Sequence, residues 1–178
     1  ISAAILQRLQ PALLRRPHLV AVKIKRDAAN HPHELWFDDE TLRDGLQSPS
    51  ARNPTIEQKI ELIDYMERLG IQKADLGLPG AGPFHIGHID AMLGHMGENG
   101  YALRPGCAVR TVVSDIEPLV DLQAKHERQI QASAFLGTSP IRQFAEDWTM
   151  ERILSTAEAA VSFAVDNDIP VMFVTEDT

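Results

Sequence analysis

The chain has 178 residues, 44% of them hydrophobic, which is enough for one compact domain with a buried core. Its 25 acidic and 17 basic residues give a net charge of -8, so it has no overall positive field to attract a nucleic-acid backbone. The apolar N-terminal stretch is interrupted by Arg8 and Pro11 and has no small-residue cleavage site, which does not fit a signal peptide or a membrane span. We therefore expect a soluble protein without nucleic-acid or membrane partners.

Residues 1–33 differ from the rest of the chain. The pattern predicts a helix followed by a basic, irregular stretch that contains Lys23, Lys25 and Arg26. We interpret this segment as an N-terminal helical appendage that packs against the remaining domain, residues 34–178, or against a partner subunit.

From Glu34 onward, strand-like and helix-like segments alternate, which is the signature of a parallel sheet with crossover helices. Each expected strand is rich in β-branched or apolar residues and is followed by a polar or glycine-containing loop. The single cysteine, Cys107, lies in one of these strands, so we expect a small core side chain in a reducing, cytoplasmic compartment. The five expected strands are residues 34–38, 71–78, 106–112, 129–136 and 170–175.

The expected helices have recognisable starts. Thr55 and Gln58 form a capping box for a helix that ends at Gly70. Ser114 predicts a similar start for a helix through about residue 125, and Thr149 opens the longest helix. Residues 85–98 indicate a helix more weakly because they contain three glycines. The first helix carries an apolar stripe of Ile56, Ile60, Ile63, Met66 and Leu69.

Two architectures fit this alternation. A five-stranded doubly wound sheet would be complete at this length, whereas a (β/α)₈ barrel typically needs about 250 residues and would stop here after its fifth strand. Both place functional groups at the carboxyl ends of the strands. The motifs at those ends must therefore decide between them.

Residues 38–47, DDETLRDGLQ, leave the first expected strand with many charges. A buried strand that ends in this way needs a ligand, a metal ion or mutual salt bridges to satisfy them. The simpler interpretation is a surface pair of Arg43 and Asp44 ahead of a turn at Gly45.

Residues 41–47, TLRDGLQ, resemble the first-strand signature of the DRE-TIM metallolyases, which include 2-isopropylmalate, homocitrate and citramalate synthases and hydroxymethylglutaryl-CoA lyase. The segments 75–79 (DLGLP), 135–139 (FLGTS) and 174–178 (VTEDT) resemble later motifs of the same family, in the same order. Four motifs at expected strand ends make the match specific over residues 34–178. The resemblance implies a (β/α)₈ TIM barrel, an α/β fold, of which this chain covers about the first five strands.

The resemblance also implies a site. Asp44 would be a ligand of a divalent metal ion, Mg²⁺, Mn²⁺ or Zn²⁺, while the family's remaining ligands, a His-x-His pair, belong to a strand beyond Thr178. Arg43 would stabilise the carbonyl oxygen or enolate, and Glu176 would organise substrate or transfer a proton. Substrate-binding roles are implied for Gln47, Asp75, Ser133, Thr138 and Thr178.

Three residues depart from the family pattern. Asp75 stands where Glu is common, Ser133 where many synthases have His, and Val174 where a small hydroxyl residue is common. Because pocket-lining residues set which side chain is accepted, these changes leave the α-keto acid open.

The implied function is that of a 2-isopropylmalate synthase-like acyltransferase of amino-acid biosynthesis. Acetyl-CoA would undergo a metal-dependent Claisen condensation with an α-keto acid, followed by thioester hydrolysis, in an enzyme expected to be a homodimer. The alternatives are a carbon–carbon lyase like hydroxymethylglutaryl-CoA lyase, and a non-catalytic half-barrel or regulatory module.

Two further motifs have simpler interpretations. His85, His88 and His95 could share a helix face and bind a second metal ion, but no acidic or cysteine partner has ligand spacing, so we expect solvent-facing histidines. The glycine-rich residues 80–82 could approach a phosphate, although a turn is favoured. Because a half-barrel leaves sheet edges open, we expect these residues to pair with another segment or to belong to a longer polypeptide.

Overall fold

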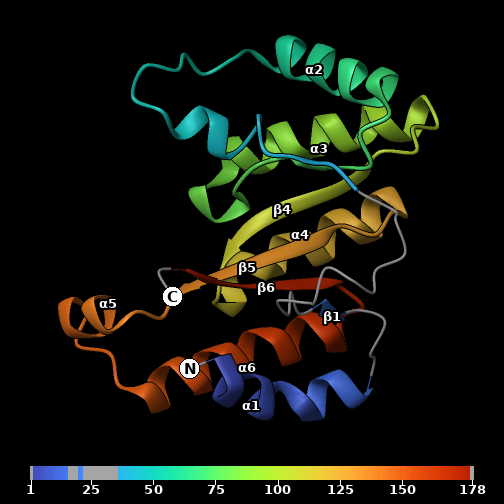
Figure 1. Cartoon of the computed structure of the whole chain (residues 1–178). Helices are drawn as coiled ribbons and strands as arrows, with labels where there is room; N and C mark the ends of the chain where they lie inside the picture. The colour runs from blue at the N-terminus through green and yellow to red at the C-terminus, as the bar shows by residue number, and fades with distance from the viewer. Residues whose placement is uncertain (1, 16–19, 22–35, 177–178) are drawn as a thin grey trace, which may run out of the picture.

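The computed structural model describes residues 2–15, 20–21 and 36–176, and its strands form one parallel sheet in the order β1-β6-β5-β4-β3-β2. The sheet curls, and the long helices lie on its outer side (Figure 1). The strands are β1 (Val20–Ala21), β2 (Asp38–Asp39), β3 (Lys73–Asp75), β4 (Arg104–Arg110), β5 (Gln131–Gly137) and β6 (Val171–Glu176). The helices are α1 (Ser2–Arg15), α2 (Ile56–Leu69), α3 (Pro83–Glu98), α4 (Val113–His126), α5 (Pro140–Ala145) and α6 (Met150–Asp166), with 3₁₀ turns η2 (Asp44–Gln47) and η3 (Pro79–Ala81).

The strand order decides between the two architectures. From β2 to β6 the strands follow one another in sequence order, each joined to the next by a helical crossover. A doubly wound sheet instead reverses its strand order at a switch point and carries helices on both faces. The curled sheet is therefore the first half of a (β/α)₈ barrel, and the open-sheet alternative is wrong.

Helix α2 forms where the sequence predicts it. The Thr55 side chain accepts a hydrogen bond from the Gln58 backbone, and the Gln58 side chain accepts one from the Thr55 backbone. Such a cap contributes about 1 kcal/mol, and Gly70 ends the helix with a left-handed φ of 72°. Ile63 is buried as expected, whereas Leu69 is 77% exposed because it occupies the last turn, where the chain leaves the helix.

The other helix starts are partly as expected. Thr149 caps α6 by accepting a hydrogen bond from the Arg152 backbone, and α3 forms despite its glycines. The predicted cap at Ser114 is wrong. The N-cap position of α4 is Val112, two residues before Ser114, and it provides no side-chain hydrogen bond. The helix starts this early because β4, which ends at Arg110, passes almost directly into it.

The N-terminal segment packs against the rest of the described chain. Helix α1 lies beside α6, and β1 adds a strand to the sheet along β6 that the sequence pattern does not predict. A strand of only two residues carries too little periodicity to be recognised in the sequence. Residues 16–19 and 22–35, with the basic stretch, lie outside the described residues.

Small side chains join the sheet to its outer helices. Ala132 and Ala134 of β5 are buried, and so are Ala157, Ala160 and Ala164 on α6, which packs on β5 and β6. Alanines on both surfaces permit a close approach of helix and sheet.

Cys107 of β4 is fully buried, and burial raises the pKa of its thiol well above the usual value, which confirms a core role. Within the described part of the chain, none of the helices combines the length and the apolar character that crossing a membrane requires.

Candidate functional site

The turn after β2 positions the first candidate residues. The Glu40 carbonyl oxygen accepts hydrogen bonds from the backbone nitrogens of Arg43, at 3.2 Å, and Gly45, at 3.0 Å. The Asp39 carboxylate accepts one from the Thr41 backbone at 2.8 Å. These bonds close a tight turn at the carboxyl end of the strand, so the Arg43 side chain is directed back toward β3.

Arg43 contacts three carboxylates. Its Nη2 lies 3.0 Å from Glu40 Oε2, its Nη1 3.2 Å from Asp44 Oδ1, and its Nε 3.7 Å from Asp75 Oδ2. The last distance is too long for a hydrogen bond, and the contact with Glu40 is an ion pair without hydrogen-bond geometry. Buried Arg43 Nε, Glu40 Oε2 and Asp75 Oδ2 therefore have no hydrogen-bond partner, a situation that is rare away from ligand or water sites.

Asp75 is fully buried at the end of β3. Its Oδ1 accepts hydrogen bonds from the backbone nitrogens of Gly77, at 3.0 Å, and Ala108, at 3.2 Å. The pKa of this carboxyl is raised to about 6, because the effects of burial and of the Glu40 charge exceed those of the two backbone donors and Arg43, which lower it. Asp75 is thus a fixed, weakly acidic group whose second oxygen faces the guanidinium.

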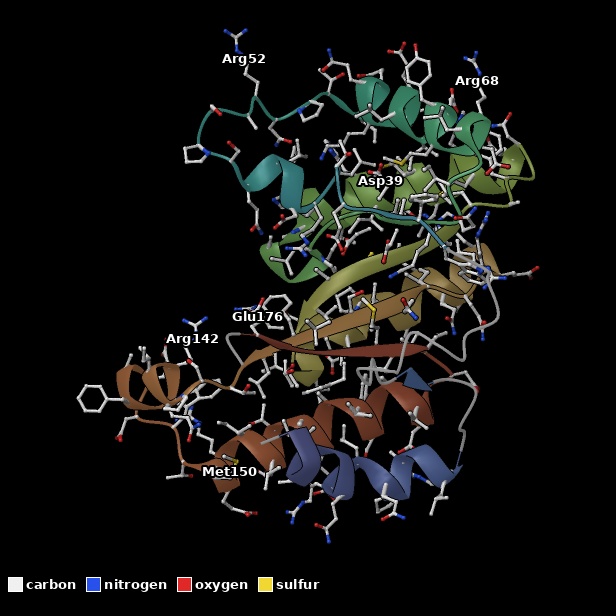
Figure 2. The ribbon with its side chains drawn as sticks, in the orientation of Figure 1. Asp39, Arg52, Arg68, Arg142, Met150 and Glu176 are labelled. Atoms are coloured by element: carbon white, nitrogen blue, oxygen red, sulfur yellow. The ribbon has the colours of Figure 1, made fainter. Side chains whose placement is uncertain are left out.

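A cavity of about 360 Å³ opens beside this cluster at the carboxyl ends of β5 and β6. Ser133 lies in its wall, is only 6% exposed, and has a hydroxyl oxygen without a hydrogen-bond partner. Glu176 lies at the end of β6, on the side from which α5 projects (Figure 2). The cavity is lined by Glu40, Arg43, Ser133, Phe135, Met172, Phe173, Val174, Thr175 and Glu176.

A second cavity of about 290 Å³ adjoins the first between β4, β5 and α5. Phe135 and Glu176 line both. Two guanidinium groups line the second: Arg142, and Arg110, whose Nε and Nη2 each lie 2.7 Å from a carboxylate oxygen of Asp115.

The structure thus brings four of the sequence-predicted residues to one place. Arg43, Ser133 and Glu176 line the first cavity, and the buried Asp75 carboxylate lies 3.7 Å from Arg43 Nε. These residues come together because β3, β4, β5 and β6 are parallel neighbours, so their carboxyl ends lie at the same end of the sheet.

The other predicted residues lie elsewhere. Asp44 touches Arg43 but its side chain is 66% exposed and does not line either cavity, and Gln47 is exposed. Thr138 is buried, and its hydroxyl donates to the Glu176 carbonyl oxygen at 3.3 Å, so it supports the end of β6. Thr178 lies outside the described residues.

The role of Asp44 as a ligand of the divalent ion implied by the sequence stays a prediction. One of its carboxylate oxygens contacts Arg43, the side chain is accessible, and a hard oxygen donor suits Mg²⁺ or Mn²⁺. The described residues contain no cluster of three His, Cys, Asp or Glu side chains, so they do not supply a complete ligand set.

The three histidines do not form a second metal centre within the described chain. His95 Nε2 lies 2.6 Å from Asp64 Oδ1, and the His88 ring packs against the Phe84 ring at an interplanar angle of 45°. Residues 79–81 form a 3₁₀ turn, as favoured. Gly80 is required there because a Cβ would overlap the buried carboxylate of Asp115.

A larger cavity, of about 790 Å³, lies at the opposite end of the sheet. It is lined by residues at the amino ends of the strands, including Lys73, Arg104 and Gln131, and contains none of the predicted site residues. In (β/α)₈ barrels the carboxyl end carries the chemistry, so the smaller cavities are the candidate site.

Sequence reasoning gave no role to Glu40 or Met172, although both line the first cavity. The period of two along a strand could have indicated Met172, because it shares the inner face of β6 with Val174 and Glu176. Glu40 could have been assigned from its position three residues before Arg43.

Comparisons with known proteins identify a family and several relatives. Residues 34–178 match the model of a family described as HMGL-like. The chain is 30% identical to homocitrate synthase AksA of Methanopyrus kandleri over 148 residues, covering 82% of this chain and 34% of that protein. It is 32% identical to 2-isopropylmalate synthase of Streptococcus gallolyticus, covering 81% and 27% respectively. The chain spans about a third or less of the length of these relatives.

Proposed function

Because the chain belongs to the HMGL-like family, in the DRE-TIM group, we propose that it is the first half of an acyltransferase barrel that condenses acetyl-CoA with an α-keto acid. The observation that carries the proposal is Arg43, which is held among Glu40, Asp44 and Asp75 at the mouth of a 360 Å³ cavity. A fixed guanidinium at this position stabilises the oxygen that becomes negative when a carbonyl is attacked.

Arg43 is suited to this role because its donors are not all used. The Nε group has no hydrogen-bond partner, and Asp75 lies 3.7 Å away, close enough to orient the guanidinium without consuming that donor. Glu40 and Asp75 would thus hold the guanidinium in the cavity wall before a carbonyl or carboxylate oxygen arrives. Such preorganisation is the largest contribution in many acyl-transfer enzymes.

A divalent cation belongs to the proposal. Asp44 would supply one of its ligands, and the ion, when bound, polarises the keto-acid carbonyl. Gln47, at the end of the same 3₁₀ turn, is proposed to approach the substrate carboxylate.

Two adjoining cavities suit a reaction with two substrates. We assign the α-keto acid to the cavity beside Arg43 and acetyl-CoA to the neighbouring cavity, which shares Phe135 and Glu176 with the first. Glu176 lies in the wall of both, the place from which a carboxylate could organise the acetyl group or accept its methyl proton. Thr138 is assigned a supporting role through its bond to Glu176, and Thr178 keeps its proposed contact with substrate.

Ser133 is proposed to bind substrate through its unpaired hydroxyl. Its neighbours on the inner face, Met172 and Val174, are apolar, so the cavity combines one hydrogen-bonding point with an apolar wall. This suits a small aliphatic α-keto acid of the kind used by 2-isopropylmalate synthases. We further propose a cytoplasmic homodimer.

The test is release of free CoA by the full-length protein, supplied with Mg²⁺ or Mn²⁺, acetyl-CoA and a panel of α-keto acids. Thiol release that depends on both the keto acid and the metal ion is the expected result. Cleavage of a 3-hydroxy-3-methylacyl-CoA without condensation would identify a lyase instead. Absence of both activities would leave the non-catalytic module as the remaining interpretation.

Arg43→Lys separates the proposed role from a general charge effect. Lys keeps the charge but loses the planar group of donors, so kcat/KM should fall about 10²- to 10³-fold. Arg52→Lys, in the exposed segment before α2, is the matched control and should leave kcat/KM unchanged (Figure 2). Equal behaviour of the two variants would remove Arg43 from the reaction.

A further inference from the structure

The outer edge of β6 is occupied by a strand from the opposite end of the sequence. β1 pairs with β6 in parallel, with Val20 beside Val171 and Ala21 beside Met172. β5 occupies the other edge of β6. In a (β/α)₈ barrel, strands follow one another in sequence order around the sheet. The position that β1 fills, next to the fifth barrel strand β6, is therefore that of the sixth barrel strand.

Helix α1 occupies the corresponding place in the outer layer. It lies alongside α6 (Figure 1), with Ile5, Leu9 and Ala12 buried at helical spacing. In a complete barrel, the helix that follows the fifth strand would lie beside α6 and lead into the sixth strand. The order of α1 and β1, a helix followed by a parallel strand, is the order of that unit.

Exposed ion pairs accompany the packing of α1 on α6. Arg8 lies 2.5 Å from Glu158 and 3.2 Å from Glu151, and Arg15 lies 2.8 Å from Asp166. All three acidic residues belong to α6, and both basic residues belong to α1. Complementary charge along a buried apolar stripe indicates a specific contact between the two helices.

We propose that the β6 edge and the outer face of α6 form a docking surface for one helix–strand unit, and that α1–β1 is an intramolecular occupant of it. The α1–β1 unit precedes residues 34–178, the part of the chain that matches the family. A strand edge pairs with one partner at a time. Docking of α1–β1 and docking of a sixth barrel strand therefore exclude each other, and α1–β1 must leave whenever the barrel closes along β6.

Hydrogen exchange on the 178-residue chain tests this proposal. Leu9, 1% exposed, is replaced in Leu9→Asp, which puts a charge into the contact with α6; Gln10→Asp adds the same charge on the exposed side of α1. Leu9→Asp should accelerate amide exchange in α1 and β6 at least about tenfold and leave β4 and β5 unchanged. Gln10→Asp should leave exchange in all four elements unchanged.

A milder pair of variants covers the case in which Leu9→Asp disturbs more than docking. Arg8→Glu should accelerate exchange in α1 and β6, and adding Glu158→Arg should restore part of the protection, because one of the two ion pairs of residue 8 is rebuilt with reversed charges while Glu151 is unchanged. Unchanged exchange in β6 when α1 is released would overturn the proposal. Equal loss of protection in β4 and β5 would also overturn it, since α1 would then be an inseparable part of the core.

Discussion

The chemistry of the site depends on Asp75, an acid held in an unusual environment. Its pKa rises from 3.8 to about 6 because it is buried, and the charges facing it are those of Arg43 and Glu40. An acid with a raised pKa in the folded state binds protons more readily there than in the unfolded chain. The resulting stabilisation is complete below about pH 4 and is lost as pH rises through about 6.

Asp75→Asn should therefore flatten the pH dependence of stability. The amide keeps an oxygen for the Gly77 and Ala108 donors but cannot ionise. Wild-type stability should contain a component of up to about 3 kcal/mol that disappears between pH 4 and pH 7, and the variant should lack it. Urea unfolding across this range measures the difference. Asp121→Asn, on the exposed surface of α4, should retain the wild-type profile.

Two hydroxyl groups allow a contrast between satisfied and unsatisfied polar atoms. Thr111 Oγ1 donates to the Phe135 carbonyl oxygen at 2.7 Å, whereas Ser133 Oγ has no partner. Thr111→Val should lose about 1 kcal/mol of stability, while Ser133→Ala should be neutral or slightly stabilising. In the full-length enzyme, Ser133→Ala should raise KM for the keto acid. Clear destabilisation by Ser133→Ala would contradict an unpaired hydroxyl.

At the level of elements, the loop after β3 depends on a glycine. A Cβ at Gly80 would meet the Asp115 carboxylate, which is 1% exposed and held by Arg110. Gly80→Ala should therefore cost about 1–3 kcal/mol. Gly87 in α3 has open space around its Cα, so Gly87→Ala should stabilise the protein by about 0.5–1 kcal/mol. Thermal unfolding of both variants checks the pair, and similar changes in both would contradict the packing argument.

The sequence predicted the elements best where local signals are strong. The caps at Thr55 and Thr149 and the alternation from residue 34 onward gave the helices and the parallel sheet, with strand bounds that differ by a few residues. The prediction of a cap at Ser114 was wrong because β4 leads almost directly into α4. In this turn the Asp115 carboxylate accepts a hydrogen bond from the Arg110 backbone. β1 could not be predicted because its pairing with β6 is a long-range contact without a local pattern.

The sequence motifs predicted which residues belong to the site, but they did not predict how far these residues lie from one another. The segment 41–47 identified Arg43, but only the fold shows that Asp75 and Ser133 approach from two other strands. The exposure of Asp44 and Gln47 also depends on the conformation of the 3₁₀ turn η2, which the motif does not encode.

At the level of the whole molecule, the concave side of the sheet is open. Phe135, Met172 and Val174 are only partly buried there. Because partly exposed apolar surface favours contact between chains, the 178-residue chain should associate as its concentration rises. Sedimentation measurements should show this, with Met172→Lys weakening association and Leu69→Lys, on the outer surface of α2, leaving it unchanged. A chain that stays monomeric at all concentrations would contradict the prediction.

The alanines between β5 and α6 have a consequence for how such a protein can diverge. Any larger residue at Ala134 or Ala160 would push the whole helix outward, so few substitutions are tolerated on this side of the strand. The neighbouring positions Ser133 and Phe135 face the cavity and carry no such restriction. The two faces of β5 therefore differ: substitutions on the face that packs on α6 disturb the fold, whereas substitutions on the cavity face change the lining of the cavity. A new substrate preference could thus arise while the packing of α6 on the sheet is kept.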